Sequence, residues 1–356
     1  MWNEGADGNR WILGGSAAEA EYAFTLHYEL PPLDRSPQNG IRLMRAAAVE
    51  PDLLAAAEIH TRSFHNIDPV ADDSYQVLRE QFYYDEEAVT YDVAKVSSIG
   101  NYRWEEVSVR PFNGEGFTLH VFTPPPTDGL PRQAVVYFPG RSMFLSAEPN
   151  CAAHIRTRLS GPLAGISPAS TVLEMDRALV LPVWTGSCER YDGFYEASPH
   201  TQVQLRASHV RAWYEELGQT LDYLDTRADI QSNNYGFLGL SYGASRPLPL
   251  LAMEDRIGAA VLYSGGFPHG DWPQIADAVN YVGRTTLPVL MLSGRFDAYR
   301  PIESAQRPFF DLLATPIEHK RFVVYEAGHF PLPRAPTLTE TADWFDRYLT
   351  TPDEPQ

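Results

Sequence analysis

After residue 93, short apolar runs alternate with amphipathic segments, and this alternation constrains the fold more than any other feature of the sequence. Four of the apolar runs contain almost no polar residue, which is typical of strands buried on both faces of a sheet. Strands that alternate with helices predict a mostly parallel sheet with helices on both faces. The expected strands are residues 103–110, 117–123, 134–138, 178–183, 235–240, 259–263, 289–292 and 321–325.

Helical periodicity fills the intervals between these strands. Apolar residues three or four positions apart between 210 and 224 form one stripe along a helix of about 20 residues, just before the fifth strand. Further helices are expected at residues 245–254, 302–313 and 338–349. Thr337 and Glu340 have the spacing of a capping box, so Thr337 is expected to cap the last helix.

Composition and charge exclude several classes of partner. With 44% hydrophobic and 21% charged residues, the chain has the composition of an ordinary globular protein. Its formal net charge of −18 repels both a phosphate backbone and an anionic membrane surface, so neither nucleic acid nor a membrane is an expected partner. The N-terminus lacks the basic region and apolar stretch of an export signal, and no apolar run approaches about 18 residues. We therefore expect a cytoplasmic protein.

The sequence holds two cysteines, Cys151 and Cys188, in no spacing typical of a metal site. A reducing cytosol keeps thiols free, so two free thiols are expected, with a disulfide as the alternative. No clustered His, Asp or Glu spacing indicates a metal, and no cofactor is expected.

One apolar run, residues 235–240, leads directly into the pattern Gly239-Leu-Ser241-Tyr-Gly243. A serine between two glycines at the end of a strand is typical of a nucleophile elbow, a sharp strand-to-helix turn that presents the hydroxyl above the sheet. The flanking residues must be small because strand and helix nearly touch there. Ser241 is therefore the candidate nucleophile.

A serine hydroxyl at neutral pH needs an imidazole to accept its proton and a carboxylate to orient that imidazole. Asp297 follows the seventh expected strand, and His329 follows the eighth. The chain order Ser241, Asp297, His329 is the order found with such an elbow. All three residues come just after the carboxyl ends of expected parallel strands, so we expect them to meet at one edge of the sheet.

Other assignments stay open for these positions. Asp297 could be an ordinary turn residue and His329 an ordinary loop histidine. Asp271, in the loop after the sixth strand, is the rival acid. Glu326 lies three residues before His329 and could support it, although a solvated carboxylate is the simpler interpretation.

Attack by Ser241 on an acyl carbon creates an oxyanion, which backbone N–H groups stabilise. The N–H of Tyr242, directly after the nucleophile at the start of a helix, is one expected donor. The second is expected from the loop after residues 134–138, where Arg141 is the first choice and Ser142 the next. The Arg141 side chain is long enough to contact a substrate carboxylate, but it could equally face solvent.

The segment after the fourth strand is dense in polar and aromatic residues at the same edge of the sheet. Together with Ser142, we expect its residues Trp184, Glu189, Arg190 and Tyr191 to contact the substrate. A structural ion pair with an Asp or Glu is the equal alternative for Arg190.

The chain is expected to consist of an N-terminal appendage, residues 1–90, and one α/β domain, residues 91–351. The first 90 residues carry Pro and Gly turn signals and an acidic run, but no long alternation of strands and helices. Within the domain, segments 141–175 and 264–286 are long and rich in Gly, Pro and aromatic residues. Connections of this length usually carry function, so we expect both to shape the substrate pocket.

These motifs together resemble the α/β-hydrolase fold, and more narrowly the dienelactone-hydrolase-like domains found at the C-terminus of some bacterial serine/threonine kinase-type proteins. The resemblance covers residues 91–349, and no kinase motif is present. The segments that carry it are 135–140, 182–191, 239–244, 288–297, 306–308 and 324–329. Dienelactone hydrolases proper often use a cysteine, so the serine of this chain implies serine-esterase chemistry.

On these grounds we expect a serine hydrolase of the carboxylesterase type that acts on a small-molecule ester without a cofactor. Thioesters, lactones and peptides are cleaved by the same chemistry and stay open as substrates. A noncatalytic binding or regulatory module that kept the scaffold is the alternative from another class. The sequence does not indicate an oligomeric state.

Residues 1–45 carry a second, weaker likeness. Segments 11–16 and 34–45 are similar to the last strands of formylglycine-generating-enzyme-like (sulfatase-modifying factor) domains. Only the tail of such a domain fits this length, and the reactive cysteines of that chemistry are missing from it. The resemblance therefore implies a remnant without activity that packs on the hydrolase domain.

Overall fold

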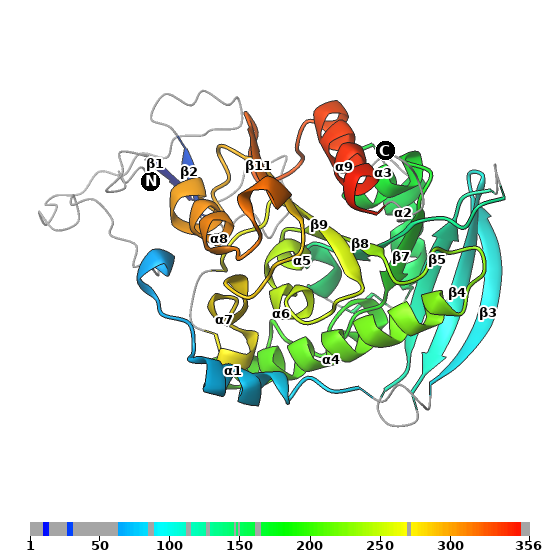
Figure 1. The fold of residues 1–356 in the computed structure, drawn as a ribbon, viewed down its shortest axis with the longest axis horizontal. Helices are drawn as coiled ribbons and strands as arrows, with labels where there is room; N and C mark the ends of the chain where they lie inside the picture. Colours follow the sequence, from blue (N-terminus) through cyan, green and yellow to red (C-terminus); the bar gives the residue numbers. More distant parts are fainter. Residues whose placement is uncertain are drawn as a thin grey trace, which may run out of the picture.

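A nine-stranded sheet forms the centre of the molecule (Figure 1). The computed structural model describes residues 10–13, 27–30, 63–84, 89–111, 115–125, 129–145, 147–148, 150–160, 165–268 and 272–349. Across the sheet the strands have the order β11-β10-β9-β8-β6-β7-β5-β4-β3. Their bounds are β3 Thr90–Ile99, β4 Tyr102–Arg110, β5 Phe117–Thr123, β6 Ala134–Phe138, β7 Ala178–Pro182, β8 Tyr235–Leu240, β9 Ile257–Tyr263, β10 Val289–Gly294 and β11 Lys320–Tyr325.

The larger part of the sheet is parallel. β6 pairs in parallel with β7 and β8, and parallel pairing continues from β8 through β9 and β10 to β11. β5 is antiparallel to β7, and β4 and β3 extend the sheet as further antiparallel strands. The carboxyl ends of β6 to β11 therefore meet at one edge, where open α/β sheets place their ligands.

This architecture confirms the predicted α/β fold class. All eight expected strands are present, and β5, β6 and β8 have the expected bounds. β3 was not predicted. Most of its residues are exposed, and its pairing with β4 shifts register between Val93 and Lys95. An edge strand of this kind has neither an apolar run nor a regular alternation.

Helices cover both faces of the sheet, because neighbouring residues of a strand point to opposite sides. On β6, the Phe138 ring packs edge-on against Trp213 of α4 with centroids 5.1 Å apart. The preceding residue, Tyr137, lines a small pocket with Ala169 of α3, and α9 lies beside α3 (Figure 1). The helix bounds are α1 Asp72–Arg79, α2 Cys151–Ser160, α3 Pro168–Glu174, α4 Pro199–Asp225, α5 Tyr242–Ser245, α6 Leu248–Leu251, α7 Val279–Val282, α8 Arg307–Leu312 and α9 Arg334–Tyr348.

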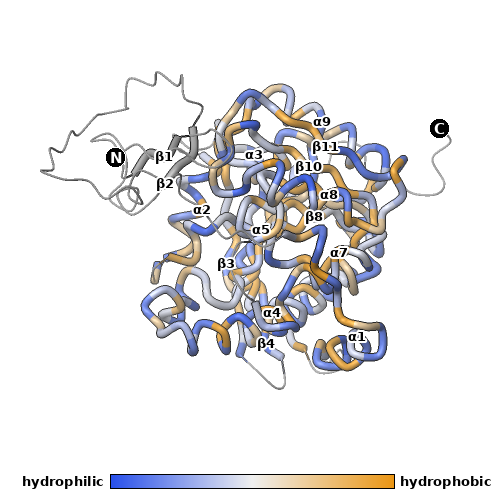
Figure 2. Tube along the Cα trace, turned by 90° about the vertical axis from the view of Figure 1, so that its left-hand side faces the viewer, coloured by the Kyte–Doolittle hydropathy of each residue, from blue (hydrophilic) through white to orange (hydrophobic). Residues whose placement is uncertain are grey.

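The apolar residues concentrate in the central strands. Every residue of β6, β8 and β10 is buried, and Figure 2 shows hydrophobic stretches at the centre with hydrophilic ones along the outer loops and helices. Within the part of the chain that the structure describes, no helix has both the length and the apolar character needed to cross a membrane.

Three helical expectations need correction. α4 has 27 residues and is longer than expected. The helix expected at 245–254 is divided into α5 and α6, because Pro247 between them has no N–H to donate. α9 begins at Arg334, so Thr337 is not its cap; the buried Thr337 hydroxyl instead donates to the Pro333 carbonyl at 2.8 Å.

Residues 63–84, which belong to the predicted appendage, pack on the domain. The buried Phe64 ring stacks on Phe267 with centroids 4.2 Å apart. In α1, the Tyr75 ring meets Tyr281 edge-on at 5.8 Å. This part of the predicted appendage therefore contributes side chains to the hydrophobic core.

The second likeness concerns residues 1–45, of which the structure describes two short strands. β1 (Arg10–Leu13) and β2 (His27–Leu30) pair antiparallel. The other residues of this segment, including 34–45, lie outside the described residues. The likeness to formylglycine-generating-enzyme-like domains and the division of the chain at residue 90 stay predictions.

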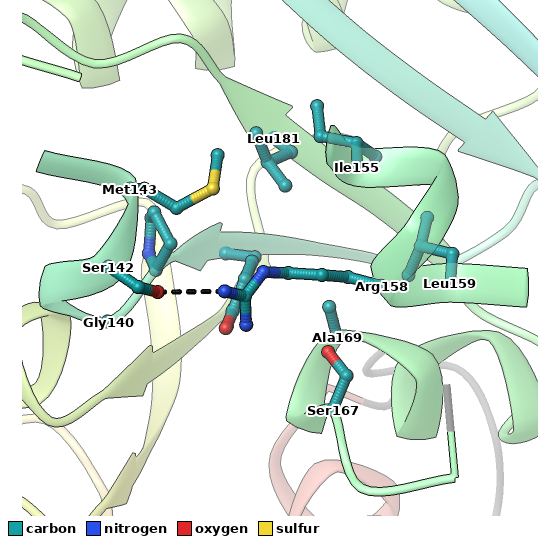
Figure 3. A pocket seen from close by; sticks show the side chains of 11 residues that line it. Gly140, Ser142, Met143, Ile155, Arg158, Leu159, Ser167, Ala169 and Leu181 are labelled. Atoms are coloured by element: carbon teal, nitrogen blue, oxygen red, sulfur yellow. Dashed lines mark hydrogen bonds between the residues drawn. The ribbon is translucent and has the colours of Figure 1, made fainter. Parts of the chain in front are cut away.

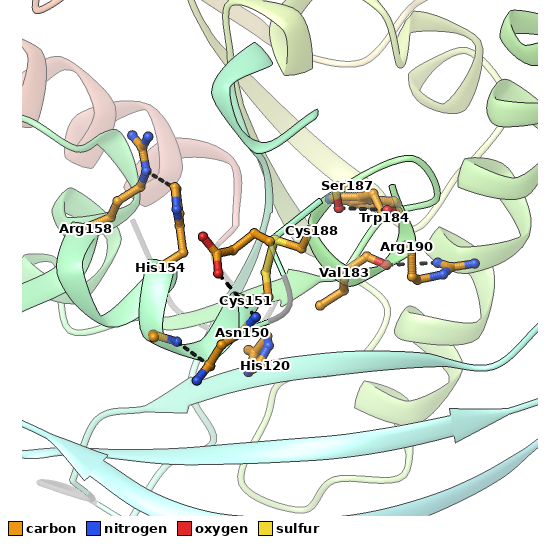
Figure 4. Close-up of a disulfide and its surroundings, with 12 residues drawn as sticks. His120, Asn150, Cys151, His154, Arg158, Val183, Trp184, Ser187, Cys188 and Arg190 are labelled. Atoms are coloured by element: carbon orange, nitrogen blue, oxygen red, sulfur yellow. Dashed lines mark hydrogen bonds between the residues drawn. A yellow bond between two sulfur atoms is a disulfide. The ribbon is translucent and has the colours of Figure 1, made fainter. Parts of the chain in front are cut away.

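Cys151 and Cys188 form a disulfide with Cα atoms 5.4 Å apart, so the expectation of two free thiols is wrong (Figure 4). Cys151 begins α2, within the expected loop 141–175, and Cys188 begins a 3-10 turn after β7. The two cysteines are 37 residues apart in the sequence, and this spacing does not indicate a bond. They become neighbours only when the chain folds. Disulfides are rare in the cytosol, so the pairing weighs against the cytoplasmic expectation.

Removing the disulfide is expected to destabilise the protein. Closing a loop of 37 residues restricts the unfolded chain and contributes about 3–4 kcal/mol to the free energy of unfolding. We expect the double variant Cys151→Ser, Cys188→Ser to show this loss in urea unfolding, and added reductant to weaken the wild type only. Reaction of both cysteines with a thiol reagent in the unreduced, unfolded wild type would contradict the bond.

A buried histidine predicts a loss of stability in acid. His120 in β5 is 1% exposed, its Nδ1 accepts a hydrogen bond from Trp104 Nε1 at 3.2 Å, and burial lowers its pKa from 6.5 to about 4. The unfolded chain therefore takes up this proton at higher pH than the folded one. Stability that is complete above pH 6.5 falls by about 3 kcal/mol as the pH drops to about 4.

The variant His120→Asn isolates this contribution, because an asparagine offers an acceptor to Trp104 but does not titrate. We expect its free energy of unfolding, measured in urea from pH 7 to pH 4, to decline less steeply than that of the wild type. Equal slopes in the two proteins would show that His120 does not cause the acid sensitivity.

Candidate active site

Ser241 lies at a sharp turn between β8 and α5. Its φ of 53° and ψ of −97° place it in a left-handed conformation that residues other than glycine rarely adopt. Its N–H donates to the Tyr263 carbonyl of β9 at 2.7 Å. A Cβ on Gly239 would lie 2.3 Å from the Gly243 oxygen, and one on Gly243 would lie 2.2 Å from the Phe138 oxygen. Both glycines are required because the backbones touch here.

Three side chains from separate loops form one hydrogen-bonded chain. His329 Nε2 lies 2.6 Å from Ser241 Oγ, and Nδ1 of the same ring lies 2.7 Å from Asp297 Oδ2. The three residues follow β8, β10 and β11 in turn. The structure therefore brings together the serine, the acid and the histidine that the sequence singles out.

Both carboxylate oxygens of Asp297 accept hydrogen bonds. Oδ1 accepts from the backbone N–H groups of Tyr299 and Arg300, each at 2.9 Å. Oδ2 faces His329 and also accepts from Gln306 Nε2 at 3.3 Å. The side chain is fully buried, so the carboxylate is held in one orientation toward the imidazole.

The loops that carry the acid and the histidine touch each other. A Cβ on Gly294, the last residue of β10, would lie 2.0 Å from the Gly328 oxygen. The His329 carbonyl accepts a hydrogen bond from the Ser264 hydroxyl, which ties the histidine loop to the end of β9. The rival acid, Asp271, lies outside the described residues.

The two amides expected to bind an oxyanion both begin helices. Tyr242 begins α5, and Arg141 begins a 3-10 helix, Arg141–Phe144, after β6. The first N–H groups of a helix have no partner within it, and neither amide has another acceptor among the described residues. Gly140 packs against β8, where its Cβ would lie 3.3 Å from Leu240. The loop is thus beside the elbow, and the roles of the two amides stay predictions.

The side chains of this loop make contacts of their own. The Arg141 guanidinium lies over the Tyr195 ring, 4.5 Å from its centroid. Ser142 Oγ accepts a hydrogen bond from Arg158 Nη2 at 2.9 Å, at a small pocket that also involves Ile155 (Figure 3). Contact of Ser142 with a substrate therefore competes with Arg158 and stays a prediction.

Two residues after β7 that were expected to contact the substrate make contacts within the protein instead. Trp184 is fully buried; its ring stacks on Phe138 at 4.5 Å and its Nε1 donates to the Tyr137 carbonyl at 3.2 Å. It is part of the hydrophobic core, which speaks against its predicted contact with a substrate. Arg190 forms a buried ion pair with Glu216 of α4, which is the structural alternative considered for it.

Glu189 and Tyr191 lie on either side of this arginine. Their contact with a substrate stays a prediction. Glu189 is exposed next to the disulfide. The Tyr191 hydroxyl donates a hydrogen bond to Glu196, five residues further along the chain. Neither contact joins these residues to Ser241.

Potential metal ligands come together once in the described part of the chain. Cys151, Cys188 and Glu189 offer ligand atoms within 4.8 Å of one another. The two sulfurs are bonded to each other, so the group offers no thiolate to a metal ion.

Two residues that hold the site were not predicted. Gln306 reaches Asp297 from a π-helical turn, and Ser264 holds the His329 carbonyl. Ser264 directly follows β9, and this strand-end position is a signal that could have identified it; Gln306 has no such signal. Glu326, considered as a support for His329, pairs with an exposed arginine instead.

The fold and this site define a protein with the α/β-hydrolase fold. No protein-family model matches the chain, and no curated protein matches it in sequence. Acetyl xylan esterase 1 from Thermoanaerobacterium sp. JW/SL YS485 aligns with a TM-score of 0.56 and 14% identity over 78% of this chain and 96% of that chain. Acetyl xylan esterase from Paenibacillus sp. R4 aligns with a TM-score of 0.52 and 15% identity over 81% and 99% of the two chains.

Glucuronoyl esterase from Solibacter usitatus is also similar, with a TM-score of 0.52 and 11% identity over 77% of this chain and 91% of that chain. At these identities the likeness to all three structures shows the fold alone. It does not carry their substrates to this chain.

The backbone contact at the elbow predicts that Gly243→Ala is destabilising. Its new Cβ would meet the Phe138 oxygen at 2.2 Å, and overpacking of this kind costs about 1–3 kcal/mol. We expect lower stability in urea and slower reaction of Ser241 with a fluorophosphonate probe. Gly165→Ala is the matched control, because its Cβ meets nothing within 4 Å. Identical behaviour of the two variants would refute the close approach.

Proposed function

We propose that this protein is a serine hydrolase of the carboxylesterase type, which cleaves a carboxylic ester through an acyl-enzyme on Ser241. The observation that carries the proposal is the hydrogen-bonded chain from Ser241 through His329 to Asp297. A serine hydroxyl becomes a useful nucleophile only with a base in hydrogen-bond reach, and the 2.6 Å between Oγ and Nε2 meets that condition.

Acylation uses the three side chains in order. As Ser241 Oγ attacks the ester carbonyl carbon, its proton moves to Nε2 of His329. The imidazolium that forms is stabilised by the Asp297 carboxylate, 2.7 Å from Nδ1. When the tetrahedral intermediate collapses, the bond from the acyl carbon to the alcohol oxygen breaks, and His329 returns the proton to the leaving alcohol.

The negative charge of the intermediate falls on the former carbonyl oxygen. We assign its stabilisation to the N–H groups of Tyr242 and Arg141, which have no other acceptor among the described residues. Removing one such donor from an oxyanion hole typically costs about 3–4 kcal/mol of the activation barrier. Of the two candidates in the loop after β6, Arg141 is preferred because it begins the helix there.

Deacylation repeats these steps with water. His329 removes a proton from a water molecule, which attacks the acyl carbon, and the bond to Ser241 Oγ breaks. The acid product leaves and the serine regains its proton. Thioesters, lactones and peptides could follow the same route. The esterase names of solved structures with this fold support ester hydrolysis as the general activity.

Replacing the nucleophile tests the proposal directly. Ser241→Ala is expected to abolish both hydrolysis of 4-nitrophenyl acetate and labelling by a fluorophosphonate probe. Asp297→Asn is expected to lower kcat by about 10³–10⁴-fold, because an asparagine holds the imidazole in the wrong tautomer. Ser208→Ala, which changes an exposed serine of α4, is the control that should keep full activity.

A folded wild type that neither hydrolyses esters nor takes up the probe, and so behaves like Ser241→Ala, would overturn the proposal. Stable binding to a protein partner together with that result would favour the noncatalytic module instead. A panel of esters, thioesters, lactones and peptides then identifies the class of bond that the active enzyme cleaves.

A further inference from the structure

We propose that the substrate carries a carboxylate group apart from its ester bond, and that the Arg246 guanidinium binds this carboxylate. The inference rests on the serine-hydrolase function proposed above and narrows its substrate class. Arg246 directly follows α5, the short helix that begins at the elbow of Ser241. Its charge is therefore held at a fixed place relative to the nucleophile.

No described residue supplies a negative partner for the charge of Arg246. Its Nε and Nη1 atoms are buried and have no hydrogen-bond acceptor among the described residues. The guanidinium lies against aromatic rings instead, 3.5 Å from the Trp272 centroid and 5.4 Å from that of Tyr242. Burial, and then the nearby Arg300, hold the pKa of this group well below its usual range. A buried cation of this kind is costly unless a ligand supplies the opposite charge.

Further arginines gather around the same place. Arg206 lies over the same indole ring at 4.3 Å, and Arg141 lies over the Tyr195 ring at 4.5 Å. Tyr195 interacts electrostatically with Arg206, Arg246 and Arg300, so these three guanidinium groups lie in the neighbourhood of one side chain. Because Arg141 belongs to the loop after β6 and Arg300 to the loop of the acid, the cluster lies at the edge of the sheet that carries the site.

The described carboxylates that interact with this cluster already have partners. Asp297 interacts electrostatically with Arg300, but its carboxylate is already hydrogen-bonded to His329 and to two backbone amides. Asp192 interacts electrostatically with Tyr242, and its carboxylate is hydrogen-bonded to His209 at 2.6 Å. Although the chain has a net charge of −18, no carboxylate in the described residues bonds to Arg246. A carboxylate of the substrate fits this place, because guanidinium and carboxylate groups form paired, charge-assisted hydrogen bonds.

Matched pairs of esters test the inference. On the acyl side, mono-4-nitrophenyl adipate is compared with neutral 4-nitrophenyl 6-methylheptanoate; on the alcohol side, 4-acetoxybenzoate is compared with 4-acetoxybenzamide. We expect the wild type to prefer the anionic member in at least one pair by kcat/KM, after subtraction of spontaneous hydrolysis. Arg246→Met is expected to lower that ratio about 10- to 100-fold, the value of one hydrogen bond to a charged group.

Two variants separate charge recognition from a structural role. Arg246→Lys keeps the positive charge and should retain part of the preference, whereas Arg347→Met, which changes an exposed arginine of α9, should leave the ratio unchanged. Because Arg246→Met removes an unpaired buried charge, we expect its melting temperature without ligand to equal or exceed that of the wild type. A lower melting temperature together with an unchanged ratio would show a structural role and overturn the proposal.

The failure of this inference differs from the failure of the hydrolase proposal. If both members of each pair are hydrolysed at equal rates, the hydrolase proposal stands and the proposed carboxylate site is overturned. If no ester is cleaved, adipate dianion serves as the probe: it should raise the melting temperature of the wild type and not that of Arg246→Met. Equal shifts in both proteins, or none in either, would overturn the site.

Discussion

The structure of the site depends on one backbone contact, between Gly243 at the start of α5 and the carbonyl of Phe138 at the end of β6. No Cβ fits between them, so the turn from β8 into α5 is compressed and Ser241 takes a φ of 53°. Strain of this kind costs about 1–3 kcal/mol and persists only where the surroundings hold it. Here the Tyr263 carbonyl holds the Ser241 N–H at 2.7 Å, so the pairing of β6, β8 and β9 supports the strained serine.

The meeting of Ser241, Asp297 and His329 could be predicted from the sequence, because each of the three residues follows an apolar strand. In a parallel sheet all such positions meet at one edge, so a pattern along the chain specifies a neighbourhood in space. The edge strand β3 has no such pattern, because most of its residues are exposed. The disulfide was equally hidden, since only the finished sheet brings α2 next to the turn after β7.

The direction in which a side chain points was the part that the sequence could not reveal. Trp184 and Arg190 follow β7 at the same edge as the site, yet Trp184 turns onto Phe138 and Arg190 pairs with Glu216. Their partners lie on other elements, so no local spacing identifies them. Gln306 is the converse case: it lies in a helical turn without a strand-end signal, and it contacts the acid all the same.

The elbow that places Ser241 also places Arg246, because only the four residues of α5 separate them. The rings of Trp272 and Tyr242 offset part of the cost of burying that guanidinium, but they bring no negative charge. A substrate carboxylate bound there would be positioned by the backbone of α5 and not by a long loop. Its binding energy would then orient the ester carbonyl toward the serine hydroxyl, which is the most effective use of contacts remote from the reacting bond. The proposed recognition of charge and the proposed nucleophile would thus both depend on the same strand-to-helix turn.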